Sequence, residues 1–394
     1  MPWAGPSNCH RHRQPRTRRQ RMQEAESHGP YREDSGGEGA ASSPRSRGAG
    51  SIESVKALRF FEPRKVAVVD VPDPHAGPGE VVLKLHATGL CNSDVRVYLG
   101  EKKAAAGVIT GHEMSGEVVE VGAGANARMG ETVAVCPIRC CGTCSFCREG
   151  YRNRCPSRKT LGYDEDGGIA EYVKIPAQLV ALGHLLPMDR AIAPQVRAFL
   201  EPFACVLNSI EEIGTGPGRA LAIVGGGPMG LVHLVAGKAY GAGPILVVEP
   251  EAERRAVALE LGADAACTPE EAAAIGKEMT GGEGFHSVAM AVGFSDAFPT
   301  ALDLARKLGR INLFAGFPPG SAYSLDLNRV HYDEVRILGT QNAPFHLYHR
   351  ASQMLGRLPA IDRIITNKYP LADAAEAYTA RLGKAGLKSA VVMG

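Results

Sequence analysis

The sequence has no apolar run of about 18 residues, the length that a transmembrane helix requires, so we expect no membrane-spanning segment. Neither sign of charge is in large excess, because 44 Lys and Arg are set against 42 Asp and Glu, for a net charge of +2. The 47 glycines follow no regular period, which excludes collagen and solenoid architectures. With 394 residues, 44% of them hydrophobic and 22% charged, the chain is typical of a globular protein of two or three domains.

The first fifty residues differ in composition from the rest. They hold nine Arg, no Lys and five acidic residues, a net of +4, so the remaining residues carry −2. Aliphatic residues are nearly absent, and we expect residues 1–54 to form a disordered tail. A signal peptide would have an apolar stretch after its basic residues, and none follows the Arg cluster. A transit peptide would be poor in acidic residues, whereas this segment contains five. The segment is interpreted either as an electrostatic tail or as a passenger before a true start of translation near Val55.

A disulfide framework is not expected, because six of the ten cysteines lie within one short segment and no secretory signal is evident. Four of them follow at steps of 3, 3 and 8 residues, which suits a closed tetrahedral zinc site of four thiolates. The predicted ligands of this structural zinc are Cys141, Cys144, Cys147 and Cys155, with Cys140 as the alternative to Cys141. Metal-binding thiols indicate a reducing compartment, and we expect a cytoplasmic protein.

Two patterns of hydrophobic residues divide the part of the chain that we expect to fold. Residues 55–90 contain short β-rich runs, such as Val66–Val69 and Val81–Leu85, separated by Pro and Gly, which indicates a small β-rich domain. From Arg219 onward, strands and helices alternate, which predicts a parallel sheet covered on both faces. The expected strands are Ala220–Val224, Ile245–Val248, Ser287–Ala291, Arg310–Phe314 and Val335–Leu338, and the expected helices are Met229–Ala239 and Glu253–Leu261.

A glycine-rich turn follows the first strand of the second pattern. Gly225, Gly227 and Gly230 fit G-x-G-x-x-G between a strand and a helix, the arrangement that binds the pyrophosphate of a dinucleotide. The free N–H groups and positive dipole end of the helix would face the phosphates. Glu249, nineteen residues after Gly230, is placed to accept hydrogen bonds from an adenosine ribose, and its charge favours NAD over NADP. Arg254 is close enough in sequence to face a phosphate, so NADP stays open.

Three further segments lie ahead of the dinucleotide motif. They are Gly89-Leu90-Cys91-Asn92-Ser93-Asp94, Gly111-His112-Glu113 and Leu200-Glu201-Pro202. With these motifs, residues 55–394 resemble the zinc-dependent medium-chain dehydrogenase/reductase family, in particular its sorbitol and threonine dehydrogenase branches. The resemblance implies an α/β fold class. A GroES-like β-barrel catalytic domain over residues 55–208 would precede a Rossmann domain with a doubly wound parallel sheet over residues 209–340, and residues 341–394 would return to the catalytic domain.

The resemblance also implies roles for individual residues. Cys91 and His112 match the ligands of a catalytic zinc, and Glu201 matches an acidic third ligand that acts directly or through water. Glu113 matches a neighbour of the metal or an alternating ligand, and Ser93 matches the hydroxyl that starts a proton relay. The resemblance places Met229, Phe314, Ala315 and Gly316 near the cofactor, and Gln341 and Asn342 beside the substrate.

The activity implied is the interconversion of a secondary alcohol (a polyol, cyclitol or sugar alcohol) and its ketone, with NAD, one catalytic and one structural zinc, in a homodimer or homotetramer. L-Threonine, an amino-cyclitol or sugar, and a phosphorylated polyol stay open as substrates. Many relatives have a histidine where this sequence has Arg96, which stays protonated and cannot relay a proton in the same way, so Arg96 is a candidate substrate contact. Lys102 and Lys103 form either a basic rim for an acidic substrate or a solvated loop.

A nucleic-acid-binding zinc protein is the alternative from another functional class. The cysteine segment would then be a zinc module and the Arg cluster an electrostatic anchor. This interpretation leaves Glu201, Glu249 and the glycine turn unexplained, and a net charge of −2 outside the first fifty residues provides no broad basic surface. We therefore expect a small-molecule substrate and no nucleic-acid partner.

Overall fold

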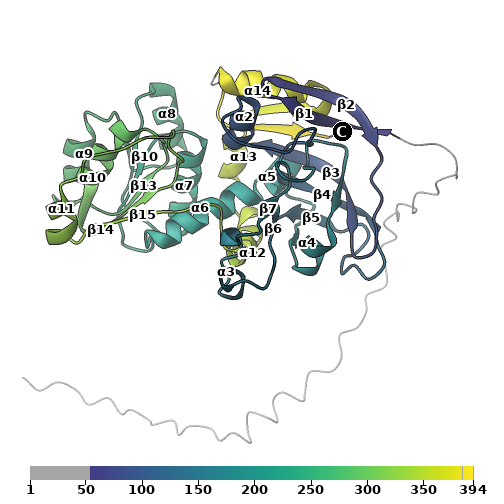
Figure 1. Cartoon of the computed structure of the whole chain (residues 1–394). Helices are drawn as coiled ribbons and strands as arrows, with labels where there is room; N and C mark the ends of the chain where they lie inside the picture. The colour runs from purple at the N-terminus through teal and green to yellow at the C-terminus, as the bar shows by residue number, and fades with distance from the viewer. Residues whose placement is uncertain (1–53, 384, 394) are drawn as a thin grey trace, which may run out of the picture. The chain divides into compact units, whose positions relative to one another are not determined.

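The structure is a computed structural model that describes residues 54–383 and 385–393 (Figure 1). The predicted disordered tail lies outside the described residues, apart from Ser54, which is the first residue of strand β1 (Ser54–Glu62). The interpretations of the Arg cluster concern the same segment and also lie outside them. Strand β1 forms an antiparallel hairpin with β2 (Lys65–Pro72).

A mostly antiparallel sheet carries the segments Gly89–Asp94 and Gly111–Glu113. Its strand order is β16-β17-β3-β4-β5-β9, and β8 also pairs with β3. The strands are β3 (Val81–Leu90), β4 (Glu113–Val121), β5 (Thr132–Val135), β8 (Tyr172–Ile175), β9 (Leu185–Pro187), β16 (Asn367–Pro370) and β17 (Ser389–Val392). Alternate residues of β3, namely Val81, Leu83 and Leu85, enter one apolar cluster, as expected for a strand with one face in the core.

The last strand of the chain belongs to this first sheet. Strand β17 pairs antiparallel with β3, and Ser389 lies opposite Leu90 at the end that leads to Cys91. In Figure 1 the yellow C-terminal elements accordingly lie beside the purple N-terminal ones. The C-terminal segment is therefore close to the candidate site. Its other elements are α13 (Ala360–Ile364), the 3-10 turn η3 (Leu371–Asp373) and α14 (Ala374–Leu382).

Short elements surround the first sheet. A long loop, which holds the clustered cysteines, is framed by the two-stranded pair β6 and β7 and contains α3 and the 3-10 turn η1. The bounds are α2 (Asn92–Tyr98), β6 (Ile138–Arg139), α3 (Ser145–Arg148), η1 (Arg152–Arg154), β7 (Lys159–Thr160), α4 (Ala177–Ala181), α5 (Pro194–Ala198) and α6 (Leu200–Glu212). Three buried cysteines are themselves the core of the loop, which contributes few other apolar side chains.

A second sheet of six parallel strands has the order β12-β11-β10-β13-β14-β15. Its strands are β10 (Leu221–Val224), β11 (Ile245–Val248), β12 (Ala265–Cys267), β13 (Phe285–Met290), β14 (Ala305–Leu313) and β15 (Arg336–Gly339). The helices that connect or follow them are α7 (Pro228–Ala239), α8 (Ala252–Glu260), α9 (Ala272–Met279), α10 (Phe298–Leu304), α11 (Leu327–Tyr332) and α12 (Phe345–Leu355), with the 3-10 turn η2 (Ser295–Ala297) before α10.

Both faces of this parallel sheet are buried. Along β10, Leu221 and Ile223 enter one apolar cluster, while Ala222 and Val224 enter another on the opposite face. An uninterrupted apolar strand is therefore required here, as expected for a sheet with helices on both sides. The strand order reverses at β10, which has β11 on one side and β13 on the other. Ligands of doubly wound sheets bind at the carboxyl ends of the strands at such a point, which is where Gly225 lies.

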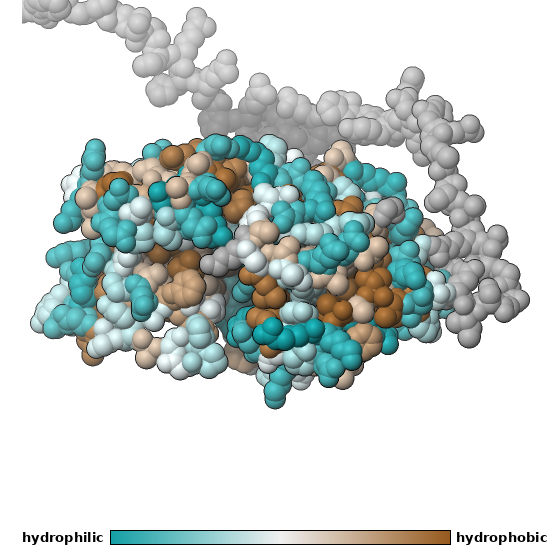
Figure 2. Space-filling view, turned by 90° about the horizontal axis from the view of Figure 1, so that it is seen from above, coloured by the Kyte–Doolittle hydropathy of each residue, from teal (hydrophilic) through white to brown (hydrophobic). Residues whose placement is uncertain are grey.

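No helix in the described part of the chain is long and apolar enough to cross a membrane. The face shown in Figure 2 is largely hydrophilic, with separate patches of hydrophobic residues between the polar ones.

Candidate active site

Cys91 lies where strand β3 ends and helix α2 begins. Its backbone N–H donates to Oδ2 of Asp94 at 2.9 Å, which joins the two ends of the first turn of α2. The Ser93 hydroxyl donates to the Cys91 sulfur at 3.1 Å. The thiol is therefore held at the end of a core strand with a hydroxyl group beside it.

His112 is positioned by the glycine before it and by two polar groups. Gly111 has a φ of 93°, and a Cβ atom there would lie 2.6 Å from Cγ1 of Ile169, so a larger residue does not fit. Nδ1 of His112 lies 3.2 Å from Oδ1 of Asp94 and 2.9 Å from the Tyr163 hydroxyl. Burial lowers the pKa of His112, but the Asp94 carboxylate outweighs burial and raises it. A carboxylate on Nδ1 leaves Nε2 for a metal.

Glu113 has a buried carboxylate group, and only one of its two oxygens has a hydrogen-bond partner among the described residues. Its Oε1 accepts a hydrogen bond from Nζ of Lys388 at 2.6 Å, whereas its Oε2 is buried without a hydrogen-bond partner among the described residues. The chain leaves room for this oxygen, because a Cβ atom at Gly89 would lie 2.0 Å from it. Ligand atoms of Cys91, His112 and Glu113 all lie within 4.8 Å of one another. A sulfur, a nitrogen and an unsatisfied oxygen at this spacing fit a zinc ion.

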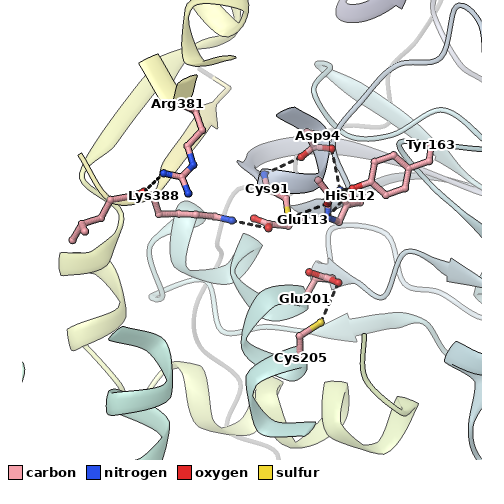
Figure 3. A network of polar contacts seen from close by, with 11 residues as sticks. Cys91, Asp94, His112, Glu113, Tyr163, Glu201, Cys205, Arg381 and Lys388 are labelled. Carbon is pink, nitrogen blue, oxygen red and sulfur yellow. Dashed lines mark hydrogen bonds and ion pairs between the residues drawn. The ribbon is translucent and has the colours of Figure 1, made fainter. Parts of the chain in front are cut away.

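Glu201 lies outside that group of three. It is on α6, and its Oε1 accepts a hydrogen bond from the Cys205 thiol at 3.3 Å. Burial raises the pKa of Glu201, which favours its neutral form in the absence of a metal. Figure 3 shows the Glu201–Cys205 pair apart from the Glu113 carboxylate, which lies between Lys388 and Cys91. The structure thus brings three of the four predicted catalytic ligands together and places the fourth nearby.

The four predicted cysteines of the second metal site converge. Sulfur atoms of Cys141, Cys144, Cys147 and Cys155 lie within 4.8 Å of one another, and among the described residues this group includes Cys141 and not Cys140. The N–H of Cys144 points to the Cys141 sulfur at 3.3 Å, and the N–H of Cys141 points to the Cys155 sulfur at 3.3 Å. Hydrogen bonds from the backbone N–H groups of Thr143 and Cys144 lower the pKa of Cys141 to about 6. Four sulfurs with N–H donors aimed at them fit a tetrahedral zinc site.

The three glycines of the dinucleotide motif have different surroundings. Gly225, directly after β10, has a φ of 105°, and a Cβ atom there would lie 2.4 Å from Cγ1 of Val292. Gly230 packs closely against the backbone of the turn, because a Cβ atom there would lie 1.8 Å from the carbonyl oxygen of Gly225. Gly227, the N-cap of α7, has open space around the position of its Cβ. The turn and the packing thus require two glycines, and the third leaves room for a ligand to approach the backbone.

Glu249, which follows β11, is joined to the glycine turn. Its Oε2 accepts a hydrogen bond from the Gly226 N–H at 2.7 Å, and its Oε1 accepts from the Glu251 N–H at 3.1 Å. Arg254 lies 3.6 Å from the Glu251 carboxylate, and Arg255 donates to the carbonyl of Glu249. Both arginines are therefore engaged by neighbours on their own segment, and a carboxylate rather than a cation lies against the turn.

The remaining predicted cofactor contacts follow the ends of the central strands. The N–H groups of Phe314 and Ala315 donate to the carbonyl of Met290 at 3.1 and 3.3 Å, which places them beside the end of β13. The Phe314 ring lies edge-on to His233, with ring centroids 4.6 Å apart. Met229, in the first turn of α7, packs partly buried against the core and accepts a hydrogen bond from His233.

The predicted substrate contacts lie in two places. The guanidinium of Arg96 is 3.7 Å from the position of a Cβ at Gly316, and its Nε is 3.5 Å from Glu101, so it faces the segment after β14. Gln341 and Asn342 instead contact the cysteine loop. The Gln341 side chain accepts from Arg154 at 2.9 Å, and that of Asn342 accepts from Arg158 at 3.0 Å.

Known proteins are similar to this chain in sequence and structure. Two family models match it, the alcohol dehydrogenase GroES-like domain over residues 77–184 and the zinc-binding dehydrogenase model over residues 228–357. L-Threonine 3-dehydrogenase of Pyrococcus abyssi is 34% identical over 314 residues, which cover 76% of this chain and 86% of the relative. The chain belongs to the zinc-dependent medium-chain dehydrogenase family. Another relative of this dehydrogenase, the D-arabitol-phosphate dehydrogenase of Enterococcus avium, is 32% identical over 80% of this chain and 90% of the relative.

A solved structure extends the comparison to the fold. A zinc-binding dehydrogenase of Sinorhizobium meliloti, bound to NADP, has a TM-score of 0.80 and 28% identity, and the match covers 86% of this chain and 99% of that one. The predicted family, fold class and reaction class are thereby confirmed. This dehydrogenase is an alcohol oxidoreductase of GroES-like and Rossmann architecture that uses zinc and a nicotinamide dinucleotide.

Four further residues of the dehydrogenase site are not among those predicted from the sequence. Asp94 follows Cys91 by three positions, and an acidic residue at the third position of a helix could have indicated its bond to the Cys91 N–H. Cys205 lies one helical turn after Glu201 on α6, so the i, i+4 spacing could have indicated it. Tyr163 and Lys388 reach the site from distant segments, and no local pattern marks them. They contact His112 and Glu113, respectively.

Proposed function

We propose that this dehydrogenase interconverts a secondary alcohol, namely a polyol, cyclitol or sugar alcohol, and its ketone by hydride exchange with NAD. The observation that carries the proposal is the convergence of Cys91, His112 and Glu113 beside an unsatisfied carboxylate oxygen. Zinc bound there supplies a Lewis acid to the alcohol oxygen, and bound NAD supplies the hydride acceptor. The catalytic-zinc ligands would be Cys91, His112 and Glu113, with Glu201 acting through water.

Around that centre, the chain orients and shields the reacting groups. Asp94 would accept the Nδ1 proton of His112 and so leave Nε2 free to bind the zinc. The hydroxyl of Ser93, held 2.6 Å from the Tyr163 hydroxyl, is the group that would accept the proton of the alcohol. Arg96 stays protonated and would contact the substrate rather than relay that proton.

The four-cysteine group would hold a structural zinc. It lies in a loop that also contacts the segment after β15, because Asn153 donates to the carbonyl of Gln341 at 3.0 Å. A closed site of four thiolates has no free position for a substrate. Its role would be to order the loop, whose apolar core consists mainly of cysteine.

NAD is the proposed cofactor, with NADP less favoured. Glu249 is 3% exposed, and its carboxylate lies against the glycine turn, where it would accept hydrogen bonds from the ribose hydroxyls of NAD. The same charge would repel the additional phosphate of NADP. Support for this choice comes from Arg254 and Arg255, which are both engaged away from the turn.

The activity is tested by NAD reduction with the purified full chain. The substrates are sorbitol, xylitol, inositol, L-threonine and simple secondary alcohols, each with and without a zinc chelator, and with NADP in parallel. We expect chelator-sensitive reduction of NAD with at least one polyol. Activity that survives removal of the zinc, or no reduction of NAD with any secondary alcohol of the panel, would contradict the proposal.

Two or four copies of the chain would associate through the edge of the second sheet. Strand β15 is the last strand of that sheet, and α11, directly before it, exposes Leu327 (75%) and Tyr332 (73%). Exposed apolar side chains beside an open strand edge favour pairing between subunits. Light scattering coupled to gel filtration is expected to give a dimer or tetramer, and a monomer at micromolar concentration would contradict this.

A cytoplasmic location fits the state of the cysteines. All nine cysteines of the described residues are free, and seven of them belong to the two proposed metal groups or lie next to them in sequence or space. Thiol ligands of this kind are maintained in a reducing compartment. Cell fractionation tests the location, and recovery from an oxidising compartment would contradict it.

A further inference from the structure

Lys102 and Lys103 are adjacent, but the structure places them differently. Lys103 is exposed, whereas Lys102 is half-buried. The Lys102 ammonium lies 3.4 Å from the centroid of the Tyr163 ring, close enough for a cation–π interaction. The hydroxyl of the same tyrosine contacts Ser93 at 2.6 Å and His112 at 2.9 Å. One lysine of the predicted basic rim therefore belongs to the active site, and the other is solvated.

Among the residues that the structure describes, the charge of Lys102 has no counter-ion of its own. Within residues 54–383 and 385–393, its Nζ makes neither a hydrogen bond nor an ion pair, apart from the contact with the Tyr163 ring. Burial lowers the pKa of Lys102, and the acidic groups that oppose this effect are Cys91, Asp94 and Glu201. Each of these is engaged elsewhere.

The engagement of those acidic groups can be followed one by one. Asp94 accepts from the Cys91 N–H and holds His112. Glu201 accepts from Cys205. The Cys91 thiolate is taken up by the metal in the proposed function. Once these groups are accounted for, the positive charge beside Tyr163 remains uncompensated.

A second cation, Arg158, lies in the electrostatic neighbourhood of Lys102. Its NH1 donates to the carbonyl of Asn153 at 3.1 Å and to Oδ1 of Asn342 at 3.0 Å, and no carboxylate of the described residues contacts it. Arg158 is also near enough to disfavour the charged form of Lys102. Two like charges that interact in this way are unfavourable unless an anion lies between or beside them.

We propose that Lys102, supported by Arg158, binds an anionic group of the substrate, so that the alcohol oxidised here carries a phosphate or a carboxylate. The inference rests on the proposed function and deepens it, because the same pocket would hold the secondary alcohol at the metal and the acidic end at Lys102. An ammonium is a compact point charge with three donors, which suits either oxyanion. The cation–π contact with Tyr163 holds the lysine in place before the substrate binds.

The test compares matched neutral and acidic substrates with the zinc-loaded full chain. The pairs are sorbitol with sorbitol 6-phosphate, arabitol with arabitol 5-phosphate, and galactitol with galactonate. We expect the acidic member of at least one pair to have the higher kcat/KM. In Lys102→Met, kcat/KM for that acidic substrate should fall about 30-fold or more through KM, which corresponds to the loss of one desolvated charge pair. The fall for the neutral member should be clearly smaller, so that the ratio of the two kcat/KM values drops.

Three controls separate charge from other roles. Lys103→Met, a change to the exposed neighbour, should leave all rates unchanged. Lys102→Arg keeps the charge and should retain most of the preference for the acidic substrate, whereas a lysine that served as a proton acceptor would not be replaced by arginine. Inorganic phosphate should inhibit the wild type in competition with the substrate, and it should inhibit Lys102→Met much more weakly.

The outcomes distinguish this inference from the proposed function. If no alcohol of either series is oxidised, the proposed function fails. If neutral alcohols are oxidised as well as acidic ones, and Lys102→Met affects both series equally, only the anion subsite is overturned. A preference for phosphates over galactonate would assign the subsite to a phosphoryl group, and the reverse would assign it to a carboxylate.

Discussion

The Lys388 ammonium lies 2.6 Å from Oε1 of Glu113, and both side chains are buried. The two residues are 275 positions apart, one directly before the last strand and the other at the start of β4. The C-terminal segment therefore neutralises a carboxylate of the proposed metal site. Breaking a buried ion pair leaves one charge uncompensated, which costs far more than the pair contributes over a neutral replacement.

The first prediction concerns this pair. Lys388→Met should lower the free energy of unfolding by about 3–5 kcal/mol, because Glu113 would remain buried without its partner. The double variant Lys388→Met with Glu113→Gln should recover part of the loss. Lys368→Met, which removes an exposed lysine that lies 3.6 Å from Asp362, should change stability by only about 0–1 kcal/mol. Urea unfolding measures all three, and a single Lys388 variant as stable as the wild type would refute the prediction.

The second prediction separates the two groups of metal ligands. Cys91→Ser should abolish turnover and remove zinc from one group while NAD binding is largely retained. Cys144→Ser should instead lower the melting temperature and the yield, because the cysteine loop would lose the metal that orders it. Zinc content, NAD fluorescence titration and thermal unfolding are measured on both variants. Near-normal activity of Cys91→Ser would show that the assignment of the catalytic ligands is wrong.

The third prediction concerns the choice of cofactor. Glu249→Ala should lower kcat/KM for NAD about tenfold or more, since hydrogen bonds to a charged acceptor contribute about 1.5–3 kcal/mol each. The kcat/KM for NADP should fall less or rise, because the variant lacks the carboxylate that repels the additional phosphate of NADP. Glu253→Ala, a change to an exposed acid on α8, is the control and should behave as the wild type. An unchanged NAD-to-NADP ratio in Glu249→Ala would contradict the proposed role.

The fourth prediction is a pH effect on stability that originates at His233. Burial lowers the pKa of His233 to about 4, whereas an unfolded histidine titrates near 6.5. The unfolded chain therefore binds more protons between these values, and the contribution to stability is complete above about pH 6.5 and lost as the pH falls to about 4. Nε2 must stay unprotonated to accept from Ser209, whose oxygen in turn accepts from Asn312.

The size of that effect follows from the shift, which corresponds to about 3 kcal/mol at most. Between about pH 7.5 and about pH 4.5, His233→Gln should lose about 2 kcal/mol less stability than the wild type. His349→Gln, a change to an exposed histidine, should lose as much as the wild type. Urea unfolding at the two pH values gives the slopes, and parallel slopes for wild type and His233→Gln would contradict the assignment.

The parts of the structure that were predictable are those with a local pattern. The strand–helix alternation and the glycine turn place β10, β11 and α7 within one or two residues of where they lie, because burial on both faces demands apolar runs. The prediction of strand β14 is less accurate, because the strand begins at Ala305 rather than at Arg310. Leu308 has a positive φ, so the first part of the strand is irregular and lacks a regular alternation of apolar residues.

The directions in which individual side chains point could not be predicted from the sequence. Lys102 and Lys103 are chemically identical neighbours, and only the fold of the loop over Tyr163 distinguishes them. The motif that contains Glu201 suggested a ligand, but its hydrogen bond to Cys205 depends on one turn of α6 facing the site. Contacts between distant segments, such as that of Lys388 with Glu113, arise because the C-terminal strand β17 pairs with β3 in the first sheet.

The fifth prediction uses two glycines of one motif as a matched pair. A Cβ atom at Gly230 would lie 1.8 Å from the carbonyl oxygen of Gly225, whereas a Cβ at Gly227 would meet nothing within 4 Å. Gly230→Ala should therefore force α7 away from β10 and lower stability by about 1–3 kcal/mol, as overpacking does. Gly227→Ala should fold with stability near that of the wild type. It should nevertheless bind NAD much more weakly, because the added methyl group occupies the space in which the pyrophosphate approaches the backbone. Thermal unfolding and NAD titration are measured on both variants. If Gly227→Ala bound NAD normally, the open space at this turn would not be the phosphate site.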